Sequence, residues 1–109
     1  MIKVEIIKEV DNIKQVTVDG HADFAEHGSD IVCAGVSAVV FGLINSVDVL
    51  DDDVQFDISA NEDETGHLTY RSLKSTNKEQ LLLNAMLIAL ETIEENYSEY
   101  ITIETREVN

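Results

Sequence analysis

Residues 31–44 have the sequence IVCAGVSAVVFGLI, which is the most apolar stretch of this chain and predicts a buried helix at the centre of its fold. Asp30 or Ser29 is a typical N-cap for such a helix, and the acidic run at residues 51–53 ends it near Val49. The stretch is shorter than the roughly 20 residues that cross a bilayer. We therefore expect a core helix and no membrane partner.

Alternating apolar and polar residues on both sides of this helix predict strands that bury one face each. The predicted order is β-β-α-β-β-α-β, at residues 2–6, 16–18, 30–49, 54–58, 68–70, 77–93 and 101–103. The second helix is expected to bury Leu81, Leu82, Met86, Leu87, Leu90 and Ile93. Strands of this kind suit a mainly antiparallel sheet of about five strands with both helices on one face. The sequence predicts one α+β domain over residues 1–109, a two-layer sandwich.

The charge balance is strongly acidic, with 22 Asp and Glu against 7 Lys and Arg and a net charge of −15. A field of that sign repels the phosphates of nucleic acids and anionic membranes, so we expect no direct binding to nucleic acid. A basic protein or peptide would be attracted. The same bias also serves solubility, so it does not by itself identify a partner.

The single cysteine cannot form an intramolecular disulfide, and the first ten residues alternate like a strand. They contain no basic segment followed by an apolar one, the pattern of a secretory signal. We therefore expect a cytoplasmic protein.

Cys33 and His21 are the residues whose chemistry best fits covalent catalysis. Cys33 is expected in the first turn of the helix, where unpaired backbone N–H groups and the helix dipole stabilise a thiolate. His21 follows a strand end, whereas His27 lies among loop residues, so we favour His21 as the general base. The N–H groups of Cys33 and Ala34 are expected to stabilise an oxyanion. Acyl transfer by these groups requires neither a cofactor nor a metal ion.

Neighbouring residues are expected to support this pair or to admit a substrate. Asp30 caps the helix, orients His21, or does both. Ser37 lies one turn beyond the cysteine on the same face. Ala34 and Gly35 keep the helix surface low, which would let an extended peptide approach.

Each candidate also has a purely structural interpretation. A cysteine in an apolar helix is most often buried in the core, and loop histidines are most often solvated. His67, placed at a strand start beyond a turn, is expected to be one of these solvated histidines.

The pieces GHA at residues 20–22 and DIVCAGVSA at residues 30–38 resemble the ribosomal-processing cysteine protease family, Prp. The likeness covers nearly the whole chain. It implies a bacterial, homodimeric cysteine endopeptidase that removes a short N-terminal extension from large-subunit ribosomal protein number twenty-seven during ribosome assembly. Such a substrate is basic, so a net charge of −15 would attract it.

The resemblance also implies roles for individual residues. His21 and Cys33 match the catalytic dyad of the family, and Asp30 and Ser37 fall on its pattern. In the family the loop between the dyad residues is thought to move when substrate binds. The hinges of that loop are expected at Gly20 and Gly28.

Two other functions stay open from the sequence. One is a non-catalytic acidic module that binds a basic ribosomal protein or an assembly factor, with Cys33 buried and inert. The other is a zinc hydrolase or deaminase that uses His21, His27 and Cys33, although their even spacing matches no common zinc finger.

Overall fold

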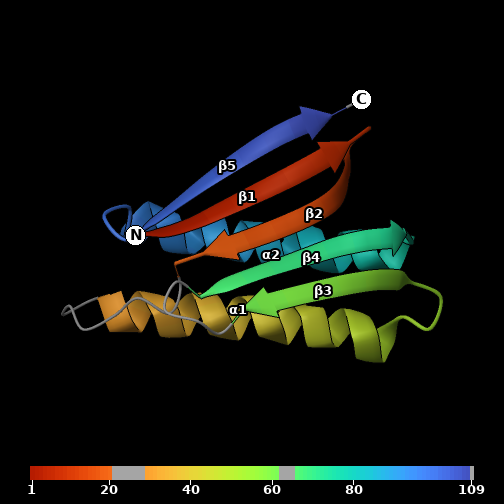
Figure 1. The fold of residues 1–109 in the computed structure, drawn as a ribbon, viewed down its shortest axis with the longest axis horizontal. Helices are drawn as coiled ribbons and strands as arrows, with labels where there is room; N and C mark the ends of the chain where they lie inside the picture. The colour runs from red at the N-terminus through yellow and green to blue at the C-terminus, as the bar shows by residue number, and fades with distance from the viewer. Residues whose placement is uncertain (21–28, 62–65, 109) are drawn as a thin grey trace.

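The computed structural model describes residues 1–20, 29–61 and 66–108 (Figure 1). Its elements are β1 (Ile2–Glu9), β2 (Asn12–Asp19), α1 (Ser29–Leu50), β3 (Gln55–Asn61), β4 (His67–Lys74), α2 (Asn77–Asn96) and β5 (Ile101–Val108). The predicted order β-β-α-β-β-α-β is confirmed.

The strands form one mixed sheet in the order β3-β4-β2-β1-β5. Three of its pairings are antiparallel, namely β1 with β2, β2 with β4, and β3 with β4. The last strand, β5, instead lies parallel to β1, with Ile2 opposite Ile101. The first and last strands of the sheet along the chain are thus neighbours, and their arrows point the same way at one edge of the sheet (Figure 1).

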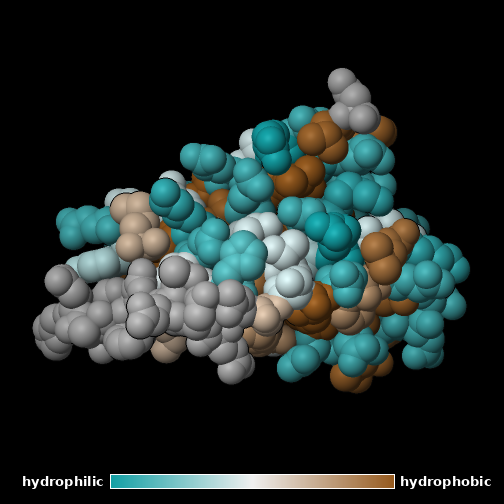
Figure 2. All heavy atoms as spheres, viewed as in Figure 1, coloured by the Kyte–Doolittle hydropathy of each residue, from teal (hydrophilic) through white to brown (hydrophobic). Residues whose placement is uncertain are grey.

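Each central strand buries every second residue against the helices. In β1, Ile2, Val4 and Ile6 are buried, whereas Lys3 and Glu5 point to the opposite face, here called the open face of the sheet. One core cluster joins the sheet to the helices through Val16, Val18, Leu68, Tyr70, Ile101, Val32, Val36, Val40, Ile44, Leu83, Met86, Leu87 and Leu90. The predicted two-layer α+β architecture is confirmed, and the open face is mostly hydrophilic (Figure 2).

The buried stripe of α2 differs from the prediction. Leu81 is 71% exposed, and Leu83 packs in the core in its place. The prediction was wrong because both leucines fit an apolar helical pattern, and the orientation of α2 is fixed instead by polar contacts at its first turn.

Residues Ile31–Leu50 of α1 are long and apolar enough to cross a membrane by length and composition. This segment is longer than the apolar stretch at residues 31–44 expected from the sequence. Its residues Val32, Val36 and Val40 belong to the core cluster with the sheet. This packing accounts for the apolar character of the inner face of the helix.

A buried carboxylate fixes the start of α2. Glu79 is fully buried and accepts hydrogen bonds from the Tyr70 hydroxyl at 2.5 Å and the Ser72 hydroxyl at 2.9 Å. Burial, and then the hydrogen bond to Glu79, raises the pKa of Tyr70 well above its usual value, so the phenol stays a donor. Because a buried carboxylate is stable only with such partners, the contact determines how α2 lies on β4.

The same first turn is tied to the end of α1. Thr76 is the N-cap of α2: its hydroxyl accepts from the backbone N–H of Glu79 at 3.1 Å and donates to the buried carboxylate of Asp51. That hydrogen bond is the main cause that lowers the pKa of Asp51. Gln80 adds a link to β2, because its side chain bonds both the N–H and the C=O of Ile13, at 2.7 and 2.9 Å. The cap therefore directly precedes residue 77, where the sequence predicted the start of this helix.

We expect Glu79→Ala to lower the free energy of unfolding by about 2–4 kcal/mol, because it leaves two buried hydroxyl groups without their acceptor. Urea denaturation followed by circular dichroism measures the change. The matched control is Glu95→Ala, which removes an exposed carboxylate from the same helix. Equal stabilities for the two variants would contradict the role assigned to Glu79.

Candidate active site

Cys33 lies one turn inside α1, because the helix begins at Ser29. Its side chain is partly buried and packs against the core cluster. Ser29 and Asp30 are the first two helical residues, so neither is the N-cap that the sequence predicted. The dipole of a helix acts mainly within its first turn, so it supports a thiolate at Cys33 less than expected, and a neighbouring imidazole has more to contribute.

The predicted oxyanion donors at Cys33 and Ala34 are also displaced. In an α-helix that begins at Ser29, the N–H of residue i donates to the C=O of residue i−4. The N–H groups of Cys33 and Ala34 therefore have acceptors within the helix. The N–H groups without a helical acceptor belong to the first turn, one turn before the cysteine.

Ser37 lies on the side of α1 that meets the ends of two strands. It borders a small apolar hollow with Val18, Val36, Val40, Phe41 and Leu68. Val18 is the second-last residue of β2, and Leu68 is the second residue of β4. The part of α1 that carries Cys33 is therefore packed beside the end of β2.

Ala34 is exposed, as a residue beside an approaching peptide would be. Gly35 has a different position from the one expected. A side chain at Gly35 would make ordinary contact with Ile93, 3.8 Å away on α2. Its small size thus concerns the packing of α1 on α2, and its expected role in admitting a peptide remains a prediction.

The end of β2 is held at Gly20. This residue has φ of +81°, and its N–H donates to the C=O of Gly66 at 2.9 Å. A Cβ placed on Gly20 would approach the carbonyl oxygen of Met1 to 2.7 Å. Only glycine fits both constraints without strain. Its expected role as a hinge remains a prediction.

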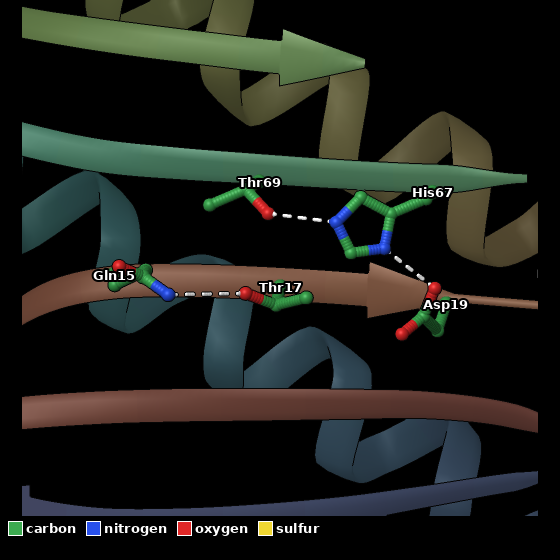
Figure 3. Close-up of polar contacts among 5 residues, drawn as sticks. All are labelled: Gln15, Thr17, Asp19, His67 and Thr69. Carbon is green, nitrogen blue, oxygen red and sulfur yellow. Dashed lines mark hydrogen bonds and ion pairs between the residues drawn. The ribbon is translucent and has the colours of Figure 1, made fainter. Parts of the chain in front are cut away.

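His67 is not the solvated histidine that the sequence predicted. Its Nδ1 lies 2.6 Å from Oδ1 of Asp19, across the β2–β4 pairing, and its Nε2 lies 3.1 Å from the hydroxyl of Thr69 (Figure 3). Sequence reasoning missed this group, because cross-strand neighbours depend on strand register. The sequence does show that Asp19 directly follows one predicted strand and that His67 directly precedes another. A carboxylate and an imidazole at such positions can pair if the two strands are neighbours.

Several candidates lie outside the described residues. They are His21, His27 and Gly28, and the side chain of Asp30 is likewise not described. The predicted dyad and the alternative zinc site thus stay predictions. Within residues 1–20, 29–61 and 66–108, no cluster of His, Cys, Asp and Glu could hold a metal ion.

Comparison with known proteins gives one family. The family model "Cysteine protease Prp" matches residues 1–102. The ribosomal processing cysteine protease Prp of Staphylococcus aureus (strain Mu50) is 44% identical over 108 residues, which covers 94% of this chain and 97% of the relative.

Two crystal structures of the S. aureus protease are similar to this chain. The complex with a substrate peptide has a TM-score of 0.87 and 42% identity, and covers 96% of this chain and 99% of the other. The complex with a covalently linked product peptide has a TM-score of 0.84 and 41% identity, with the same coverage.

We expect Gly20→Ala to lower the free energy of unfolding by about 1–3 kcal/mol, since it strains the backbone and crowds Met1. Gly42→Ala is the matched control: it lies in α1 with nothing within 4 Å of the added Cβ. That control is expected to stabilise the protein by about 0.5–1 kcal/mol, because alanine favours a helix. Thermal unfolding of both variants checks the opposite signs.

Proposed function

The chain belongs to the ribosomal processing cysteine protease Prp family and is a cysteine protease, and from this premise we propose that it removes the N-terminal extension of large-subunit ribosomal protein number twenty-seven. Cys33 is the nucleophile and His21 the general base of this proposal. The reaction takes place in the cytoplasm, where ribosomes assemble. Family membership also overturns the interpretation of the chain as a non-catalytic acidic module.

The proposed reaction has two steps. The Cys33 thiol gives its proton to His21, and the thiolate sulfur attacks the scissile carbonyl carbon to form a tetrahedral oxyanion. The C–N bond then breaks, the imidazolium returns the proton to the leaving amine, and a thioester remains on the enzyme. Water, deprotonated by the same imidazole, attacks the thioester, and the acid product and the free thiol are released.

One observation in the described part of the chain carries the proposal: the helix that bears Cys33 packs beside the strand end that precedes His21. Val18 of β2 and Ser37 of α1 border the same hollow. This packing supports the pairing of a nucleophile on α1 with a base that follows β2 in the sequence, because positioning of reactive groups by the fold lowers the cost of bringing them together. The covalently linked product reported for the S. aureus relative supports a covalent route here.

The charge of the protein supports a basic substrate. Two copies of a chain at −15 repel each other, whereas a basic ribosomal protein is drawn in. Salt screens this attraction, so its contribution falls as the ionic strength rises.

Incubation with the extended ribosomal protein tests the function. We expect mass spectrometry to find one new N-terminus, and Cys33→Ala to abolish it, because the sulfur forms the covalent intermediate. A substrate that already lacks the extension is the matched control and should stay intact. Cleavage that survives in Cys33→Ala would sink this mechanism.

We further propose that the protein is a homodimer that associates through the outer face of α1. This face carries the exposed residues Ile31, Ala34, Ala38, Phe41, Asn45 and Val49. The sequence contains no charged residue between Asp30 and Asp48. Two acidic subunits therefore meet here with little repulsion between like charges, and an exposed apolar face of this kind is typical of an interface.

We expect Phe41→Glu to weaken the dimer by about tenfold or more, because it places a negative charge in an apolar interface between two acidic subunits. Sedimentation equilibrium measures the dissociation constant. Val10→Glu is the control, since it alters an exposed apolar residue at the β1–β2 turn. A monomeric wild type, or equal constants for both variants, would contradict the proposed interface.

A further inference from the structure

A polar cluster outside the proposed dyad lies on the open face of the sheet, where the end of β2 pairs with the start of β4. Asp19 and His67 are register partners there, and Thr69 is two residues further along β4 (Figure 3). The His67 side chain is 38% exposed and that of Asp19 is 50% exposed. Across the sheet on the other side of Asp19 lies Lys3 of β1.

Both ring nitrogens of His67 are engaged. Nδ1 donates to the Asp19 carboxylate at 2.6 Å, and in the neutral ring Nε2 accepts from the Thr69 hydroxyl at 3.1 Å. The ring is thus held by two neighbours in one orientation, and neither nitrogen is left to take a proton from a substrate. This arrangement suits a structural link between strands better than a second general base.

The order carboxylate, imidazole, hydroxyl also occurs in hydrolase triads, so a second nucleophile at Thr69 has to be considered. Thr69 lies inside β4, which pairs with both β2 and β3 at this residue. Its backbone is committed to the sheet and is not available as an oxyanion hole. The cluster therefore lacks what an acyl-transfer site requires.

The position of the cluster along the chain is more informative. Asp19 is the last residue of β2, and the next residue, Gly20, donates its N–H to Gly66, the residue before His67. At the end of β2, Asp19 is thus tied to His67 through their side chains, and Gly20 is tied to Gly66 through the backbone. Strand ends otherwise fray, and these two links hold the end of β2 against the start of β4.

We propose that His67 and Asp19 form a positioning pair for the candidate base His21, an inference that rests on the proposed proteolytic mechanism. One peptide unit, about 3.8 Å between α-carbons, separates Gly20 from His21. A displacement of the strand end is therefore passed on to the base. Neither member of the pair touches the reacting atoms.

Kinetics of four variants test the pair. We expect His67→Ala and Asp19→Ala each to lower kcat/KM by about tenfold to a hundredfold, mainly through kcat, because a misplaced base slows the chemical step. The double variant should lose little more than the worse single variant, since the two residues act as a unit. Asp19→Asn should recover most of the activity, because its amide oxygen can still accept from Nδ1 of His67.

The control is Arg71→Ala, which breaks the link from Arg71 to Gln15, another pair on the same face of β2 and β4 but away from the strand end. It should keep the wild-type kinetics. The rate of Cys33 alkylation across pH gives a second readout that needs no substrate: in His67→Ala the reactive thiolate should appear only at higher pH than in the wild type. If His67→Ala fails to fold, Asp19→Ala and Asp19→Asn test the same point.

The outcomes distinguish a failure of the positioning pair from a failure of the proposed function. Wild-type kinetics and alkylation in His67→Ala, together with an inactive Cys33→Ala, would overturn the positioning pair alone. A change confined to KM would also overturn it, because it indicates contact with the substrate. Cleavage that persists in Cys33→Ala would overturn the proposed function, and this inference with it.

Discussion

The fold depends on one buried carboxylate. Glu79 has no contact with water, so it is stable only while Tyr70 and Ser72 donate to it. These donors lie on β4, the acceptor lies in the first turn of α2, and Thr76 extends the network to Asp51 at the end of α1. β4, the first turn of α2 and the end of α1 thus share one hydrogen-bonded network, and a shift of any of them would leave a buried polar atom without a partner.

This network also affects the candidate active site at the other end of α1. From Asp51 to Cys33 the helix rises by about 27 Å, at about 1.5 Å per residue. Because a helix of this length is stiff and its inner face packs on the sheet throughout, the anchor at Asp51 helps to determine where the thiol lies. The end of β2 is fixed separately, through Gly20 and the Asp19–His67 pair. The two halves of the proposed dyad therefore extend from two independently anchored elements.

The sequence predicted the fold well, because hydrophobic alternation responds directly to a sheet that is covered on one face. It could not predict which face of α2 is buried, since Leu81 and Leu83 are equally apolar. The contacts of Glu79 determine that Leu83 faces the core. It placed Cys33 too near the helix start, because several capping residues stand in a row before it. It missed the contact of His67 with Asp19, because the partner of a strand residue depends on the register between strands. No local pattern in the sequence reveals that register.

The parallel pairing of β1 with β5 determines when the sheet can be completed during synthesis. β1 is synthesised before β5, so the edge of β1 that faces β5 has no partner until β5 has left the ribosome. Contacts between such distant segments close a long loop and form slowly. During synthesis β1 presents a strand edge to its surroundings, which is a site for unwanted pairing. A cysteine protease of this family thus completes its own sheet only after the ribosome has released β5.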